Sequence, residues 1–225
     1  MTGHVFITGG TGYMGSRLIP LLMADGHQVT ALVRQSSKDK LPAGCRAIVG
    51  DALDGDSYRA GVMGAQTFIH LVGVSHPSPA KAREFVAIDG RAALEAIRVA
   101  RLASVSHFIY LSVAHPAPVM KAYVDVRMKC EEALGESGLP ATILRPWYVL
   151  GPGHRWPYAL IPFYKLAEQL PGTREGAVRL GLVTIHEMVS ALRFATENPT
   201  RGTRVIEPKD IRAIHAGRWS LKAAV

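Results

Sequence analysis

The residues best suited to chemistry in this chain form a glycine-rich segment close to its N-terminus. Residues 5–7 are a short apolar run of the kind that becomes a buried strand, residues 8–15 read TGGTGYMG, and residues 16–23 have helical periodicity. A strand, a glycine turn and a helix in this order are the context of a dinucleotide-binding fingerprint. The backbone N–H groups and the positive end of the helix dipole would then receive a pyrophosphate. An ordinary tight turn is the alternative, which the position between strand and helix disfavours.

Arg34 follows the second predicted strand, residues 28–33. An acidic residue at this place binds the ribose 2′-hydroxyl of NAD, whereas an arginine suits the 2′-phosphate of NADP. Residues 35–38 add hydroxyl groups and another cation just beyond. An exposed arginine at a strand end is the competing interpretation. The sequence therefore favours NADP as the cofactor, with NAD possible.

Asp51 lies just beyond the third predicted strand, residues 46–49. In open α/β sheets the carboxyl ends of the strands form the rim where ligands bind. Asp51 could accept a hydrogen bond there from an adenine amino group, or it could cap the helix predicted to begin near Asp54. The spacing leaves both interpretations open.

The fourth predicted strand, residues 67–72, is nearly all apolar and is expected to be buried on both faces. Gly73 follows it and permits a close approach to a cofactor. His70 interrupts the apolar strand without a recognisable ligand partner. We therefore interpret His70 as a hydrogen-bonded core histidine in preference to a catalytic one.

The elements that must position these residues alternate between strand and helix. Two more strands are predicted at residues 107–112 and 141–145, with helices between the strands at residues 80–103 and 120–135. This alternation predicts an α/β fold with a doubly wound parallel sheet of strand order 3-2-1-4-5-6. We expect residues 1–155 to form a Rossmann domain. Residues 156–225 are expected to complete it as a small cap at the carboxyl edge of the sheet, with predicted helices at 158–169 and 187–197 and predicted strands at 182–185 and 204–207.

Composition narrows the class of protein. The chain has 225 residues, 48% of them hydrophobic, a formal charge of +8 and scattered Lys and Arg residues. This pattern favours a solvated basic surface over a nucleic-acid interface. No apolar run reaches the ~20 residues that span a bilayer, and the N-terminus lacks a signal-peptide pattern. Cys45 and Cys130 have no metal-ligand spacing, so we expect no metal site and two reduced thiols in a cytoplasmic protein. The sequence specifies no oligomeric state.

Several motifs together resemble the short-chain dehydrogenase/reductase superfamily. They are T-G-x-x-G-x-x-G at residues 8–15, Gly50-Asp51, Tyr-Leu-Ser at 110–112 and Leu-Arg-Pro at 144–146, in the order that the superfamily shows. The resemblance covers residues 3–200. It is strongest to the extended and atypical members, which include NmrA-like, isoflavone-reductase-like and complex I accessory-subunit groups and the NAD-dependent epimerase/dehydratase type of Rossmann domain.

The resemblance implies a set of residues that line the cofactor, with the loop after Arg145 beside the nicotinamide. These residues are Gly9, Gly10, Thr11, Gly12, Tyr13, Met14, Gly15, Arg34, Asp51, Ala52, Leu71, Val72, Gly73, Arg145 and Pro146.

The resemblance also implies a catalytic trio. Ser112 would orient a substrate oxygen, Tyr123 would exchange a proton with it, and a lysine four residues after the tyrosine would lower the tyrosine pKa and hold the ribose. Here that fourth residue is Arg127. Its charge suits the role, but its planar fork and fixed protonation differ from those of lysine. Lys129 lies roughly 160° away around the helix and does not replace it.

Two functions follow from this departure. The first is an NADP-dependent oxidoreductase acting on a small carbonyl or related substrate. The second is a non-catalytic dinucleotide-binding protein, either a redox sensor or an accessory subunit of an electron-transfer assembly. Sugar-nucleotide epimerisation is a weaker third, because the C-terminal region is short.

Overall fold

The protein is built around one large parallel sheet. The computed structural model describes residues 2–74, 78–117, 119–152 and 180–219. Within them, seven strands pair in the order β3-β2-β1-β4-β5-β6-β9, and every pair is parallel. The strands are β1 (His4–Thr8), β2 (Gln28–Val33), β3 (Arg46–Val49), β4 (Thr67–His70), β5 (His107–Leu111), β6 (Ala141–Leu144) and β9 (Thr203–Ile206). The predicted doubly wound fold and its strand order 3-2-1-4-5-6 are confirmed, and the strand predicted at residues 204–207 lies beside β6 as β9.

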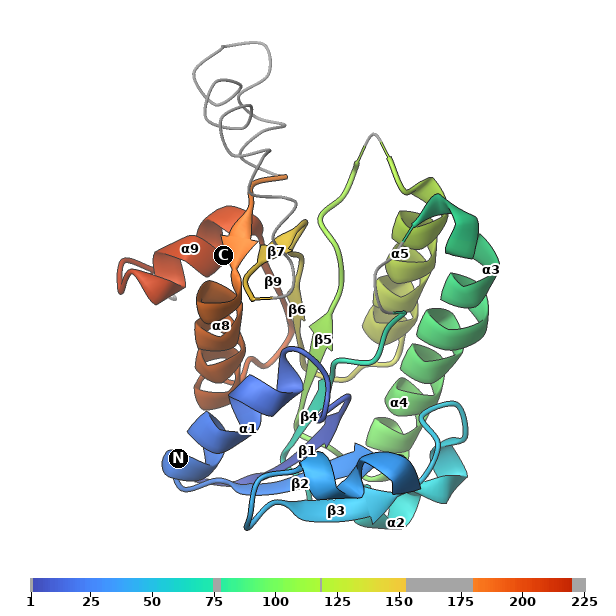
Figure 1. Cartoon of the computed structure of the whole chain (residues 1–225), viewed down its shortest axis with the longest axis vertical. Coiled ribbons are helices and arrows are strands. Elements are labelled where there is room, and N and C mark those ends of the chain that lie inside the picture. Colours follow the sequence, from blue (N-terminus) through green and yellow to red (C-terminus); the bar gives the residue numbers. More distant parts are fainter. Residues whose placement is uncertain (1, 75–77, 118, 153–179, 220–225) are drawn as a thin grey trace.

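Helices cover both faces of the sheet (Figure 1). On one side lie α1 (Gly15–Ala24), α8 (Ile185–Glu197) and α9 (Pro208–His215), and on the other lie α3 (Ala82–Glu84), α4 (Arg91–Leu102) and α5 (Lys121–Glu136). The shorter helical segments are η1 (Gln35–Lys40), η2 (Gly55–Ser57), α2 (Arg59–Val62), η3 (Pro79–Lys81) and the π-helical η4 (Phe85–Gly90).

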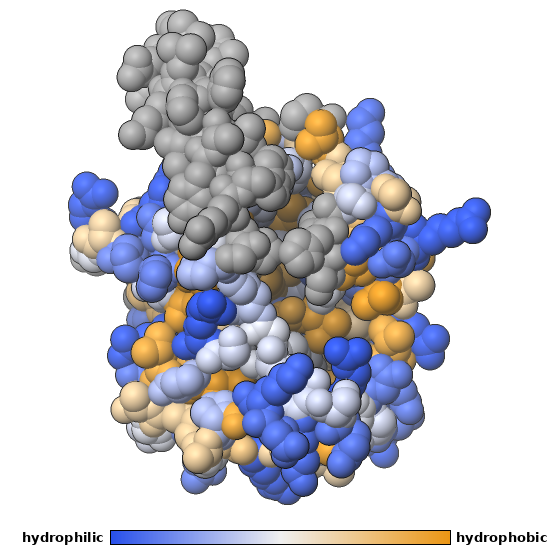
Figure 2. All heavy atoms as spheres, in the orientation of Figure 1, coloured by the Kyte–Doolittle hydropathy of each residue, from blue (hydrophilic) through white to orange (hydrophobic). Residues whose placement is uncertain are grey.

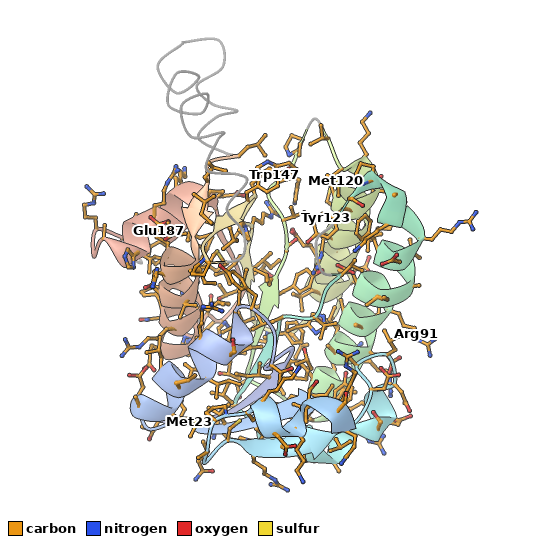
Figure 3. The ribbon with its side chains drawn as sticks, in the orientation of Figure 1. Met23, Arg91, Met120, Tyr123, Trp147 and Glu187 are labelled. Atoms are coloured by element: carbon orange, nitrogen blue, oxygen red, sulfur yellow. The ribbon has the colours of Figure 1, made fainter. Side chains whose placement is uncertain are left out.

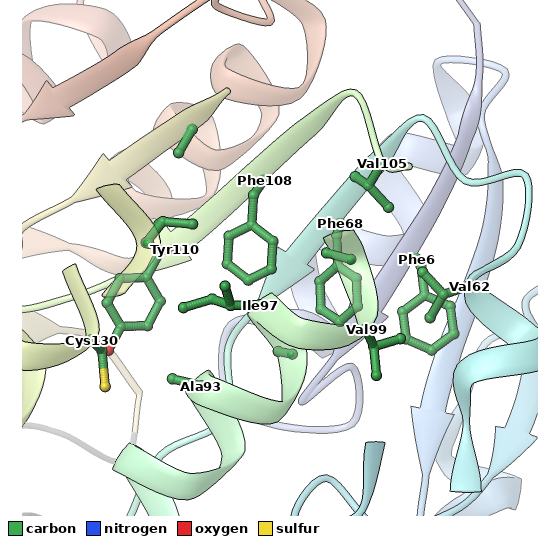
Figure 4. Close-up of a cluster of buried hydrophobic side chains, with 14 of the residues drawn as sticks. Phe6, Val62, Phe68, Ala93, Ile97, Val99, Val105, Phe108, Tyr110 and Cys130 are labelled. Carbon is green, nitrogen blue, oxygen red and sulfur yellow. The ribbon is translucent and has the colours of Figure 1, made fainter. Parts of the chain in front are cut away.

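Alternation along the central strands divides the core into two layers. Val5 and Ile7 of β1 face the cluster that contains Leu18 of α1 and Leu192 of α8. Phe6, between them, faces the opposite cluster. There the rings of Phe6, Phe68 and Phe108 form a ladder across three strands, with ring centroids 5.1 Å apart at each step (Figure 4). Buried aromatic pairs of this kind stabilise beyond their area alone. The ladder therefore stabilises the register in which Phe6 pairs with Phe68 and Phe68 with Phe108.

Strands β4 and β5 end earlier than the sequence predicts. β1 turns into the glycine segment after Thr8, which pairs with His70, so β4 loses its β1 partner beyond that residue. Residues 71–74 therefore leave the sheet as a loop, after Leu71 N–H donates to the Thr8 carbonyl at 3.1 Å. β5 ends at Leu111, which leaves Ser112 one residue beyond the strand.

The predicted helix at residues 80–103 is helical but not uniform. A π-helical turn, η4, separates the short α3 from α4. Such turns insert an extra residue, rotate the side chains that follow, and frequently occur at functional sites. Asp89 lies within this turn and is fully buried.

The described C-terminal residues join the sheet at its edge. β7 (Val149–Leu150) pairs with β8 (Val183–Thr184), and α8 then begins with a capping box formed by Thr184 and Glu187. β9 pairs with β6, and α8 packs against α1. The helix predicted at residues 158–169 lies outside the described residues. No helix in the described ranges has the length and apolar character needed to cross a membrane.

Candidate dinucleotide site

The glycine segment forms a tight loop at which two glycines are sterically required. Gly9 has φ +78°, and a Cβ there would lie 2.9 Å from the carbonyl carbon and oxygen of Leu71. A Cβ on Gly15 would lie 2.5 Å from the Gly9 carbonyl oxygen. Gly12 N–H donates to that same oxygen at 3.0 Å and closes the turn. Backbone is thus packed on backbone at both ends of the loop, which no larger residue allows.

Gly12 itself is different, because it faces outward. Apart from its chain neighbours, a Cβ there would have only the Gly9 oxygen within 4 Å, at 3.1 Å. The helix behind it, α1, begins without a side-chain cap and has no acidic residue in its first turn. An uncapped helix N-terminus beside an open glycine has the donors and the dipole sign that an anion needs. The segment therefore fits the pyrophosphate of a dinucleotide.

The other residues of the loop face the protein. Tyr13 and Met14 pack against the core cluster shared by α1 and α8. The Arg17 guanidinium lies 4.4 Å from the centre of the Tyr13 ring. A Cβ on Gly10 would lie 3.0 Å from the side chains of Ala31 and Ile19. Thr11 is half-buried beside Gly12. These contacts hold the loop on the sheet while Gly12 remains accessible.

Arg34 and Asp51 lie beyond the carboxyl ends of neighbouring strands. Arg34 is exposed just after β2 and forms no ion pair with any acid in the described part of the chain. Asp51 Oδ1 accepts the Leu53 N–H at 2.9 Å. It is Asp54 that caps the following η2, by accepting the Asp56 N–H. Figure 2 shows hydrophilic residues gathered over the region of η1 and β3.

The loop that follows β4 lies directly against the glycine loop. Its residues Leu71, Val72 and Val74 are half-buried and Gly73 is exposed. Leu71 is held by Thr8 and packs on Gly9, while the Val74 N–H donates to Asp89 Oδ2 at 2.9 Å. Both predicted cofactor segments are thus brought together at one edge of the sheet.

Arg127 is buried and paired. Its Nη2 lies 2.5 Å from Asp89 Oδ1, and its Nη1 donates to the Leu111 carbonyl at 2.9 Å. Burial raises the pKa of Asp89, and the Arg127 guanidinium and the Val74 N–H oppose that rise. The Asp89 carboxylate therefore faces the positive charge that the resemblance assigns to tyrosine activation.

Tyr123 lies over this ion pair. The Arg127 guanidinium is 5.1 Å from the centre of the Tyr123 ring, and the ring packs on Phe85 at 5.0 Å. In Figure 3, Tyr123 of α5 and Met120, which precedes α5, lie at the same end of the molecule as Trp147, beyond the carboxyl ends of the strands. Tyr123 and Arg127 are thus in contact, but the guanidinium contacts the ring face.

Ser112 is hydrogen-bonded to a network of half-buried charged side chains. Its hydroxyl donates to Glu131 Oε1, and Glu131 also accepts from Arg145. Arg145 Nη1 donates in turn to Glu207 at 3.1 Å. The adjacent Pro146 is buried, and its carbonyl accepts the Ala114 N–H. No hydrogen bond joins Ser112 to Tyr123 or Arg127 among the described residues, so the trio lies at one edge with Tyr123 and Arg127 in contact and Ser112 apart from them.

His70 is a core residue, as the sequence favoured. Its Nδ1 lies 2.8 Å from the Thr8 hydroxyl, and its ring stacks against Tyr110 at 6.0 Å. His107 is similarly buried, with Nε2 2.9 Å from the Thr142 hydroxyl. The described residues hold no group of three or more His, Cys, Asp or Glu side chains with metal-binding geometry.

These two buried histidines should make the protein acid-sensitive. Burial and the Arg127 charge lower the pKa of His70 from 6.5 to about 3, and burial and the Arg204 charge lower that of His107 from 6.5 to about 4. Between the unfolded pKa of 6.5 and the folded values of about 3 and about 4, the unfolded chain binds more protons than the folded one. The free energy of unfolding therefore falls as the pH drops from 6.5 toward these values. Each histidine should remove about 2 kcal/mol of the unfolding free energy by about pH 5.

Urea unfolding near neutral pH and near pH 5 measures this loss. His107→Gln should weaken the pH dependence, and His186→Gln, at an exposed position of α8, is the matched control. An unchanged pH dependence in His107→Gln would contradict the assignment of that histidine.

Asp89 and Glu131 belong to this region of the structure but were not predicted from the sequence. Asp89 stands four residues after the core residue Phe85, so an acid at core spacing in an apolar helix was the available signal. Glu131 gave no such signal, since it lies between other charged residues of α5.

The fold and the loop geometry define a Rossmann protein of the dinucleotide-binding class. Residues 9–159 match the family model described as NAD(P)H-binding, and the chain belongs to that family.

The known proteins that are similar to this chain are longer than it is. A ceramide reductase of Caulobacter vibrioides is 27% identical over 93% of this chain, which spans 65% of that reductase. A 3-diazoavenalumate denitrifying reductase of a Streptomyces species is 26% identical over 96% of this chain and 79% of its own length. The crystal structure of the Bordetella bronchiseptica enzyme WbmH in complex with NAD+ has a TM-score of 0.69 at 19% identity, covering 92% of this chain and 76% of WbmH. At that identity, the structural likeness concerns the fold alone.

Proposed function

We propose that the protein is an NADP(H)-dependent oxidoreductase acting on a small carbonyl or related substrate. The observation that carries the proposal is the open Gly12 at the uncapped N-terminus of α1, which suits a pyrophosphate. A bound nicotinamide would supply the hydride chemistry. Two of the relatives are named as reductases, which supports the reaction class.

In this proposal the residues at the carboxyl edge divide the work. The glycine loop binds the pyrophosphate and Arg34 binds the 2′-phosphate. Asp51 Oδ2 accepts a hydrogen bond from the adenine amino group. Tyr123 holds the proton that the substrate oxygen gains or loses. Ser112 orients that oxygen, and the segment at Arg145 and Pro146 borders the nicotinamide.

A second candidate is a dinucleotide-binding protein without catalysis, such as a redox sensor or an accessory subunit. Two observations favour it. The charge of Arg127 is paired with Asp89, and the Ser112 proton is donated to Glu131. Following NADPH oxidation over quinones, aldehydes and enones separates the two candidates. Turnover of any of these substrates supports the enzyme, and NADPH binding without turnover supports the sensor.

The proposal extends to the organisation of the chain. Residues 1–155 would form the dinucleotide-binding domain, and residues 156–225 would complete it as a small cap. The pairing of β9 with β6 supports such a shared core. A cytoplasmic location is supported by the two free thiols, Cys45 and Cys130.

NADPH should bind more tightly than NADH, by roughly 10- to 150-fold, because a charge-assisted contact to the 2′-phosphate is worth ~1.5–3 kcal/mol. Arg34→Ala should remove most of this preference. Fluorescence titration of wild type and variant with both cofactors measures it.

Arg46→Ala is the matched control, since Arg46 is also exposed but begins β3 at the opposite edge of the sheet. It should keep the wild-type preference. Equal affinities for NADPH and NADH in the wild type would overturn the NADP assignment.

A further inference from the structure

Asp89 is an acidic residue buried in the interior of the protein. It is fully buried on the π-helical turn η4, between the core residues Phe85 and Ala92. A buried carboxylate is costly unless it is paired and hydrogen-bonded. Asp89 has both kinds of partner, because Oδ1 meets the Arg127 guanidinium and Oδ2 accepts the Val74 N–H. Its carboxylate therefore joins two helical segments to one backbone position in the loop after β4.

That loop is held at two points. At its start, the Leu71 N–H donates to Thr8, and the Leu71 carbonyl packs on Gly9 of the glycine loop. At its end, Asp89 accepts from Val74. The backbone between these points runs past the glycine loop, where a dinucleotide would lie.

The middle of the loop rests on Arg127. A Cβ on Gly73 would collide with Arg127 Nη2 and would lie 3.1 Å from Asp89 Oδ1. Arg127 cannot retreat freely, because Nη1 is bound to the Leu111 carbonyl and Nη2 to Asp89. The ion pair is therefore a fixed support beneath the exposed Gly73.

We propose that Asp89 and Arg127 are positioning residues, which hold the loop of residues 71–74 against the glycine loop and thereby set the affinity for the dinucleotide. The inference rests on the proposed dinucleotide site. In this proposal Arg127 supports the backbone of the cofactor loop. It does not activate Tyr123, which is the role of the superfamily's lysine. A loop already in its binding conformation spares the ligand the cost of ordering it.

The pair can be removed without leaving a buried charge. Replacing both partners by apolar residues of similar volume is often neutral or stabilising, whereas removing one is strongly destabilising. Asp89→Leu/Arg127→Met should therefore remain folded, with a melting temperature close to that of the wild type. Its Kd for NADPH should rise by roughly 5- to 150-fold. The Val74 N–H loses its acceptor, a loss worth ~1–3 kcal/mol, so NADPH binding must order a loop that is no longer held in place.

Arg204→Met is the matched control for losing a buried arginine. Arg204 is buried and donates to Thr142 and to the Asn198 carbonyl, near the amino end of β9 and away from the loop. This variant should bind NADPH as the wild type does. A folded double variant with the wild-type Kd would overturn the inference.

A second experiment needs no removal of charge. Gly73→Ala should weaken NADPH binding, and the loss should be smaller when Arg127→Lys is also present, because lysine lacks the fork that the new Cβ would strike. Equal losses in both backgrounds would show that Gly73 acts on the cofactor alone and would contradict the inference. If the wild type binds no dinucleotide, the proposed function fails instead, so the two failures are distinguishable.

Discussion

Gly12→Val should abolish dinucleotide binding while the protein remains folded. The valine side chain would occupy the open space at the N-terminus of α1, where the pyrophosphate is proposed to bind. We expect an affinity loss of at least about 100-fold, since several phosphate contacts of ~1.5–3 kcal/mol would be lost together. Fluorescence titration with NADPH measures the loss, and circular dichroism measures folding.

Substitutions of two other glycines are the controls for this result. Gly135→Val, at an exposed position of α5 with nothing within 4 Å of a new Cβ, should leave binding unchanged. Gly15→Ala should destabilise the fold itself, because its Cβ would lie 2.5 Å from the Gly9 oxygen. Wild-type affinity in Gly12→Val would show that this turn does not hold the phosphates.

Tyr123→Phe should lower oxidoreductase activity by ~10²–10⁴-fold if Tyr123 is the general acid or base. NADPH affinity should hardly change, because only the hydroxyl is removed and the ring can keep its contacts with Phe85 and Arg127. The NADPH-oxidation screen supplies the measurement, with Tyr58→Phe, whose ring is buried against Phe6, as a control for loss of a tyrosine hydroxyl elsewhere on the chain. Full turnover in Tyr123→Phe would refute the proton-transfer role and spare the oxidoreductase proposal.

Arg127→Lys sharpens this experiment. It restores the superfamily's spacing and charge, but it loses the two-pronged contact that the guanidinium makes with Asp89 and the Leu111 carbonyl. An enzyme that uses its cation to activate Tyr123 should tolerate the change in kcat. If the arginine supports the cofactor loop, the change should appear first in the affinity for NADPH.

The strand, glycine turn and helix that begin within residues 3–15 could be predicted without a structure, because the sequence patterns that indicate them are local. A buried strand, glycines at fixed spacing and a periodic helix follow one another directly in sequence. The same is true of the strand order, since strands joined by helices pair in parallel with one handedness. The geometry of Gly9 and Gly15 agrees with this reasoning, because each is packed on backbone that the motif itself supplies or that β4 brings beside it.

The partners of the charged side chains could not be predicted in this way. Arg127 meets Asp89 38 residues away, and Arg145 meets Glu207 62 residues away. The sequence shows these side chains only as charges on separate elements. Their pairing depends on the π-helical turn that directs Asp89 inward and on β9 lying beside β6, which brings Glu207 to Arg145.

The sequence by itself therefore determined the sheet, the glycine loop and the placement of candidate residues at one edge, because hydrophobic periodicity and glycine spacing act within a few turns of chain. Only the tertiary structure decided what Arg127 and Ser112 contact. A buried ion must be paired wherever packing places it, and the available partner is set by helices that meet across the core. For Arg127 that partner is Asp89, while the buried Ser112 hydroxyl donates a hydrogen bond to Glu131.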